Sequence, residues 1–72
     1  NYVVVEAFRN EENAYKAVDI LRDKGVTAYI AFNKDRKIYY IYTHMFVDPD
    51  EARRQRDEWR EGEFKNAWIF TY

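Results

Sequence analysis

Apolar residues along the chain follow two spacings, one typical of strands and one typical of helices. Four stretches are rich in β-branched and aromatic residues and are predicted to be strands: residues 2–8, 26–32, 38–43 and 67–72. Residues 11–24 and 49–61 instead carry apolar side chains three or four positions apart, which predicts two amphipathic helices. The polar residues 33–36 predict a hairpin turn between the second and third strands.

Local signals mark where each helix begins and ends. Asn10 and Asp48 are favoured N-cap residues, and both are followed by acidic residues that suit the positive end of a helix dipole. Pro49 is favoured at the first helical position. Gly25 and Gly62 are expected to end the two helices.

The chain also repeats internally. Residues 2–21, shifted forward by 38 positions, match residues 40–59 in residue type. The matched positions are Tyr2 with Tyr40, Val3 with Ile41, Val4 with Tyr42, Phe8 with Phe46, Ala14 with Ala52 and Leu21 with Trp59. Two halves of this kind predict an α+β fold of order βαββαβ, ferredoxin-like or RNP-like, with a four-stranded antiparallel sheet and both helices on one face.

Because strand side chains alternate, each strand assigns its residues to two faces. The smaller aliphatic residues are expected to lie under the helices: Val3, Val5, Ala28, Ile30, Ile41, Thr43, Ala67 and Ile69. The open face then carries Val4, Tyr29, Ala31, Tyr40, Tyr42, Trp68 and Phe70. An exposed aromatic surface commonly marks a binding site. The alternatives are a face covered by a partner subunit or a further helix, and the high strand propensity of aromatic residues.

Composition restricts the classes of function. The chain has 72 residues, enough for one small domain, and it has no cysteine, which suits the cytoplasm and the periplasm equally. Twelve basic and 13 acidic residues give a net charge of −1, which argues against a general nucleic-acid binder. No apolar run reaches the roughly 20 residues of a membrane span. We expect residues 1–72 to be a single domain of a longer protein, with any targeting segment outside it.

Signals for catalysis are weak. His44 is the only histidine, and no pattern supplies a nucleophile with a base or a set of metal ligands. Asp48 and Glu51 form an acidic pair that helix capping explains. We therefore expect a protein that is not an enzyme, with no catalytic residue, metal or cofactor.

Several segments, in this order and spacing, resemble the SPOR domain, a small bacterial module. They are Val3–Phe8, Asn13-Ala14, Asp23–Val26, Tyr39–Phe46, Asp50–Ala52 and Ala67–Ile69, and together they span nearly the whole chain. SPOR domains bind peptidoglycan, preferring glycan strands without stem peptides at the division septum. The resemblance implies a module of the periplasm or cell envelope, a monomer or weak dimer, that makes no membrane contact of its own.

The resemblance also implies the glycan-binding residues. They are expected to be Val4, Ala7, Tyr29, Tyr40, Tyr42, Trp68 and Phe70. The chain departs from the family at Val4, Glu6 and Ala7, where Gln, Gly and Ser are common, and the carboxylate of Glu6 would repel an anionic ligand. Aromatic rings that stack on sugar rings are expected to carry the binding.

Two other functions use the same face. The RNA-recognition fold has the same βαββαβ order, and its central strands stack bases on aromatic side chains, a role that suits Tyr40 and Tyr42. The face could also be the interface of a protein-interaction or dimerisation module.

Overall fold

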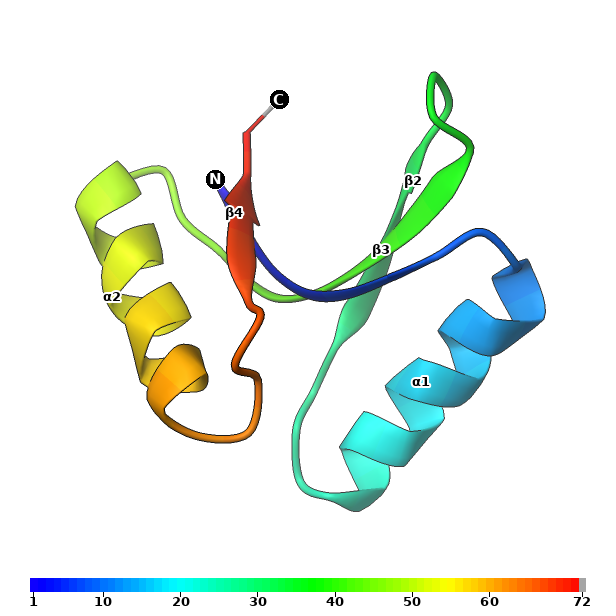
Figure 1. Ribbon diagram of the computed structural model, residues 1–72, viewed down its shortest axis with the longest axis horizontal. Coiled ribbons are helices and arrows are strands. Elements are labelled where there is room, and N and C mark those ends of the chain that lie inside the picture. The colour runs from blue at the N-terminus through cyan, green and yellow to red at the C-terminus, as the bar shows by residue number, and fades with distance from the viewer. Residues whose placement is uncertain (72) are drawn as a thin grey trace.

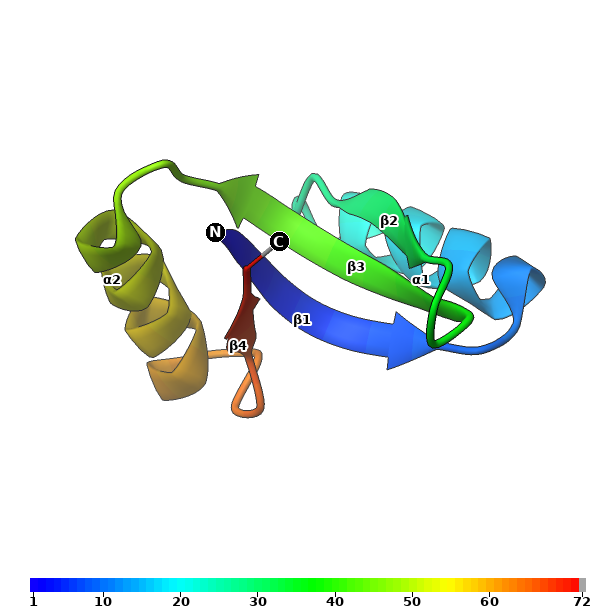
Figure 2. The ribbon, with the colours of Figure 1, turned by 90° about the horizontal axis from the view of Figure 1, so that it is seen from above.

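The computed structural model describes residues 1–71 and has the predicted βαββαβ order. Its elements are β1 (Tyr2–Phe8), α1 (Glu11–Asp23), β2 (Tyr29–Asn33), β3 (Ile38–Met45), α2 (Pro49–Glu61) and β4 (Trp68–Phe70). The strands form one antiparallel sheet in the order β2-β3-β1-β4, so β3 and β1 are central. In Figure 1 α2 stands to the left of β4 and α1 lies at the lower right, below β1 and β3. In Figure 2 α1 passes behind the sheet and no helix crosses in front of it, so one face is uncovered, as predicted.

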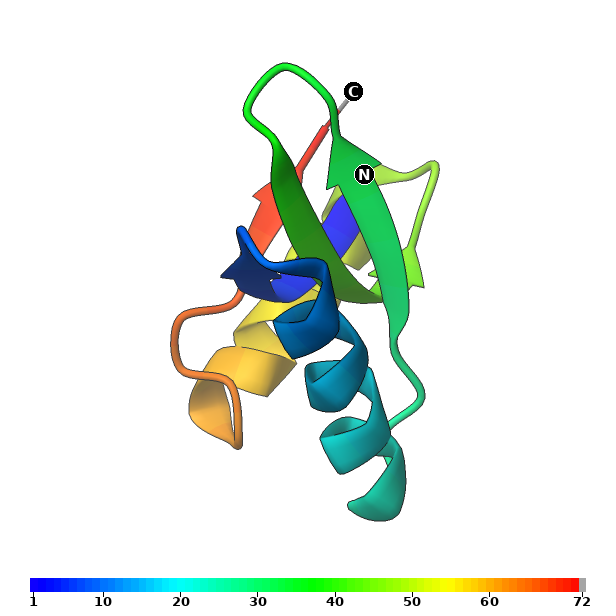
Figure 3. The ribbon, with the colours of Figure 1, turned by 90° about the vertical axis from the view of Figure 1, so that its right-hand side faces the viewer.

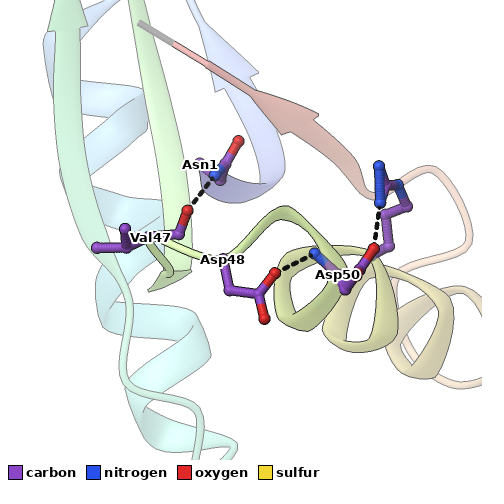
Figure 4. A network of polar contacts seen from close by, with 5 residues as sticks. Asn1, Val47, Asp48 and Asp50 are labelled. Carbon is purple, nitrogen blue, oxygen red and sulfur yellow. Dashed lines mark hydrogen bonds and ion pairs between the residues drawn. The ribbon is translucent and has the colours of Figure 1, made fainter.

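Both predicted N-caps are confirmed. The Asn10 side-chain oxygen accepts hydrogen bonds from the backbone N–H groups of Glu12 (2.8 Å) and Asn13 (3.3 Å). Asp48 accepts from the N–H of Asp50 at 2.9 Å, as Figure 4 shows. These bonds satisfy N–H groups that have no partner within the first turn of a helix.

Asn1 forms hydrogen bonds with the segments that follow β3 and β4. The Asn1 side-chain amide donates a hydrogen bond to the Val47 carbonyl at 3.0 Å (Figure 4). The hydroxyl of Thr71 donates to the Asn1 side-chain oxygen, also at 3.0 Å. Asn1 therefore links the β3–α2 connection to the residue that follows β4.

The second strand begins later than the predicted Val26. The Val26 N–H donates to the Leu21 carbonyl at 2.8 Å, so Val26 closes the last turn of α1. Gly25, at φ 87°, supplies the left-handed residue that this ending requires. The second half of the chain ends α2 with the same bond, from Phe64 N–H to the Trp59 carbonyl at 3.0 Å.

The other strand ends also differ from the expectation. β3 continues to Met45, two residues beyond the predicted Thr43. β4 covers Trp68–Phe70 within the predicted residues 67–72, and position 72 lies outside the described residues.

Pairing between β1 and β3 is interrupted twice. Val3 pairs with His44, Val4 with Tyr42, and Glu6 with Ile41, so Val5 and Thr43 are skipped. These two residues are 38 positions apart and therefore correspond in the internal repeat. Each is the extra residue of a bulge, which breaks the alternation of faces along its strand.

The bulge at Val5 corrects one expectation about the open face. Simple alternation places Glu6 on the face of Val4, but Glu6 lies opposite Ile41, a core residue beneath the helices. Ala7 lies opposite Tyr40 and so joins Val4 on the open face. The carboxylate of Glu6 is therefore directed away from that face.

The core lies between the sheet and the helices, where eight buried residues cluster: Val5, Ala14, Ala17, Leu21, Ala28, Ile41, Phe64 and Ala67. α1 packs on β1, β2 and β3, whereas α2 packs on β1, β3 and β4. No Cα atom of α1 lies within 8 Å of one of α2, and the two helices stand apart in Figure 1. The helices therefore have no close backbone approach to each other, although Lys24, after α1, forms an ion pair with Glu63, after α2, at 3.3 Å.

Candidate functional site

The uncovered side of the sheet carries a connected set of aromatic rings, here called the aromatic face. Its residues are Tyr2, Val4, Ala7, Tyr29, Tyr40, Tyr42, Trp68 and Phe70. Tyr42 on β3 is the centre of one group of rings. Its ring centroid lies 4.9 Å from that of Tyr2, in an edge-on arrangement, and 5.5 Å from that of Tyr29. Three strands thus contribute to one group of tyrosines.

A second group extends across the sheet to its other edge. The ring of Tyr40 lies 4.8 Å from that of Phe70 and 6.3 Å from that of Trp68, although β1 runs between β3 and β4. The β1 residues at this level are small, with Ala7 opposite Tyr40 and Val4 opposite Trp68. Small side chains on β1 therefore allow rings from β3 and β4 to meet above it.

The residues of the aromatic face differ in how much of each side chain is exposed. Val4 has no exposed surface and Tyr40 only 6%, so both lie beneath neighbouring side chains. Tyr29 is 52% exposed, and Ala7 is also exposed. Four further rings are half-buried, with one side packed and another open: Tyr2, Tyr42, Trp68 and Phe70. A ligand on this face would meet these rings first.

All seven residues proposed from the sequence as a binding site lie together on the aromatic face. Val4 and Ala7 share it because of the bulge at Val5, since simple alternation would separate positions 4 and 7. Tyr2 belongs to the same surface but was missed. Its spacing of two residues from Val4 was the available signal.

None of the eight residues of the aromatic face is charged. Its polar groups are the hydroxyls of four tyrosines and one indole N–H. A flat apolar surface with hydroxyl groups suits a neutral or weakly charged ligand that has flat apolar faces and hydrogen-bonding groups of its own.

Tyr39 lies on the opposite, helix-covered side and has a different environment. Its hydroxyl donates a hydrogen bond to Glu11 at 3.4 Å. Partial burial, followed by the negative charge of Glu11 and this hydrogen bond, raises the pKa of Tyr39. This perturbed group is therefore separate from the aromatic face.

The single histidine also lies on the helix-covered side. His44 Nδ1 is 2.9 Å from the hydroxyl oxygen of Thr43, and the imidazole stacks on Phe46 with an interplanar angle of 4°. The ring of Trp59 lies 6.3 Å away. These contacts give His44 a structural role at the junction of β3 and α2.

Residues 1–71 contain neither a cluster of metal ligands nor a membrane-spanning helix. In this range no three His, Cys, Asp or Glu side chains are placed to hold a metal ion. Neither helix is long and apolar enough to cross a membrane.

Comparison with known proteins gave one match. A family model described as SPOR domain matches residues 2–71. Neither the curated proteins nor the solved structures contain a significant match to this chain.

Proposed function

Because this chain belongs to the SPOR domain family, whose members bind peptidoglycan, we propose that its aromatic face binds glycan strands that lack stem peptides. The domain is a binding module of the bacterial cell wall and contributes no chemistry of its own. Its role is to bring the protein that carries it to the division septum, where amidases produce such strands.

The observation that carries this proposal is that two groups of rings lie on one uncovered face and adjoin where Tyr2 pairs with Phe70. Tyr42 contacts the rings of Tyr2 and Tyr29, and Tyr40 supports Trp68 and Phe70 from below. Sugar rings have apolar C–H faces that pack against aromatic rings, while hydroxyl and acetamide groups bond at the margin. Tyrosine provides both a flat face and a hydroxyl, at a small cost in conformational entropy.

The two apolar substitutions on β1 determine how the face would bind. Val4 stands where the family commonly has Gln, and its side chain is buried, so it supports the rings above it. Ala7 stands where Ser is common and leaves an exposed, shallow position beside Tyr40. Binding would therefore rest on the rings and their hydroxyls.

Co-sedimentation with purified peptidoglycan sacculi tests the proposal. The folded domain is expected to sediment with sacculi, and more of it after amidase treatment has removed stem peptides. Tyr29→Ala should reduce the bound fraction, whereas Tyr15→Ala should not, because Tyr15 is 57% exposed but lies on α1. Equal recovery of folded protein with and without sacculi would refute the proposal.

A further inference from the structure

The outer edge of β2 is an unpaired strand edge. β2 ends the sheet on one side, and no other strand of the described part of the chain bonds to its outer side. In Figure 3 β2 lies toward the viewer at the side of the sheet, with α1 below it. Alternate residues of β2 therefore direct their backbone N–H and C=O groups to the side away from β3.

Natural proteins usually protect such an edge with a charge, a proline, a bulge or a very short strand. β2 has none of these features. Residues 29–33 contain no charged residue and no proline, and β2 pairs with β3 without a register shift. The first charged side chain is Lys34, in the following turn. The opposite edge of the sheet is different, because β4 has only three residues.

We propose that β2 pairs with β2 of a second copy of this chain, antiparallel, about a two-fold axis at Ala31. In this register Ala31 faces its own copy, Ile30 faces Phe32 of the second copy, and Tyr29 faces Asn33. The first of these contacts is between two small residues. The second is a pair of an aromatic with a β-branched residue, which stabilises neighbouring strands. Phe32 is 43% exposed in the single chain, so the pairing would cover apolar surface.

The lack of charge is what favours a second copy over another partner. A strand that pairs with itself in an antiparallel register places like residues near one another, and like charges directly opposite would oppose it. Residues 29–33 avoid that cost. A two-fold axis also makes the contact closed, so pairing stops at the dimer.

The dimer would form one continuous eight-stranded sheet. Tyr29 belongs to the aromatic face, and Ala31, opposite Tyr40, lies on the same side of the sheet. Ile30 lies opposite the core residue Ile41 on the other side. A two-fold axis perpendicular to the sheet keeps both aromatic faces on the same side. If the proposed glycan binding is correct, the two aromatic faces of the dimer could contact the same glycan strand and would bind it more tightly than one face alone.

Sedimentation equilibrium without any glycan tests the dimer separately from the glycan proposal. Five residues form a small interface, so association is expected in the weak range, near about 1 mM. The weight-average mass should rise from 8.8 kDa toward twice that value as protein concentration increases. A constant monomer mass up to about 2 mM would overturn the proposal.

Opposite charges at the axis test the register. Ala31→Glu and Ala31→Lys should each remain monomeric alone, because a charge would face its own copy, whereas an equimolar mixture should form the dimer. Ala7→Glu adds the same charge to the same face but on β1, and should dimerise like the original chain. Unchanged dimerisation of Ala31→Glu would overturn the proposal.

Amide hydrogen exchange on the unmodified chain gives a second measurement that does not depend on variants. Amides of β2 should exchange more slowly as concentration rises, while those of β4 should not change. Concentration-dependent protection of β4 in place of β2 would contradict the proposed edge.

Discussion

The indole Nε1 of Trp59 donates a hydrogen bond to the hydroxyl oxygen of Thr43 at 2.9 Å, and this bond ties α2 to the sheet. Thr43 is buried and is the residue skipped in the pairing of β3 with β1. The bulge therefore directs a hydroxyl toward the helix at the position where α2 presents its largest side chain.

Breaking this bond should lower stability. Trp59→Phe is expected to lower the free energy of unfolding by about 1–2 kcal/mol, and Thr43→Val by about 1–3 kcal/mol, because it leaves the indole N–H unpaired in a half-buried site. In a double-mutant cycle measured by urea unfolding, the combined variant should lose less than the sum of the two. Strict additivity would show that the bond does not contribute.

Neighbouring residues of β3 should separate binding from stability. Tyr42→Ala is expected to remove about 1–3 kcal/mol of glycan-binding free energy, by analogy with stacking on other open faces. Ile41→Ala should cost about 2–5 kcal/mol of stability, because Ile41 is fully buried. Titration with glycan fragments and urea unfolding measure the two effects. If Tyr42→Ala unfolds the domain while Ile41→Ala only weakens binding, the assignment of faces is wrong.

Tyr40 should behave differently from Tyr42, although both belong to the aromatic face. Tyr40 is only 6% exposed and supports Trp68 and Phe70, so Tyr40→Ala should cost about 3 kcal/mol of stability. Tyr40→Phe keeps the ring and should remain close to the original stability. If thermal unfolding showed unchanged stability for Tyr40→Ala, Tyr40 would not be the residue that supports Trp68 and Phe70.

Glu6 and Ala7 provide a test of the bulge at Val5. Glu6→Gln should leave glycan affinity unchanged, because Glu6 faces a hollow of about 340 Å³ beneath the sheet, lined also by Lys16 and Lys24. Ala7→Glu should lower affinity by a factor on the order of ten, about 1.4 kcal/mol, because it adds a carboxylate to the aromatic face. If Glu6→Gln changed glycan affinity and Ala7→Glu did not, the side chains of β1 would alternate simply and the bulge at Val5 would be wrong.

Salt should have little effect on ligand binding. The aromatic face has no charge and the chain has a net charge of −1, so stacking would dominate. Raising NaCl from about 50 to 200 mM should change glycan affinity less than twofold, whereas a nucleic-acid complex would weaken steeply as counterions return to the phosphates. Steep salt dependence, together with binding of single-stranded oligonucleotides, would favour the RNA-recognition alternative.

Tyr39 should titrate at a higher pH than an ordinary tyrosine. Partial burial raises its pKa most, and Glu11 adds to the effect, so the folded protein holds this proton more tightly than the unfolded chain. Its contribution to stability is complete below about pH 10 and is lost as the pH rises through the pKa of the folded state. NMR titration of labelled tyrosine rings should show that the pKa of Tyr39 is raised less in the Glu11→Gln variant than in the original chain. An unchanged Tyr39 titration in that variant would exclude Glu11 as a cause.

Much of the fold could be predicted because its signals are local. The cap residues Asn10 and Asp48, the ending at Gly25 and the alternation along Tyr40–Tyr42 each depend on a few neighbouring residues. These features were sufficient to predict the order of elements and the two faces of the sheet.

What the sequence did not predict depends on contacts between distant segments. The bulges at Val5 and Thr43 arise from the pairing of two strands, and nothing in Val3–Ala7 alone indicates which residue is skipped. The burial of Tyr40 likewise depends on rings supplied by β4, about 30 residues later in the sequence. For this reason most residues of the aromatic face could be predicted from the sequence, but Tyr2 was missed and the burial of Tyr40 was not expected.

The separation of α1 from α2 has a consequence for motion. Because α1 and α2 have no close backbone approach to each other, we expect local opening of one helix to begin without opening of the other. α2 buries one residue, Ala52, whereas α1 buries three. The amides of α2 are therefore expected to become accessible to solvent first. We therefore expect amide exchange to be fastest in α2, slower in α1 and slowest in the central strands β1 and β3.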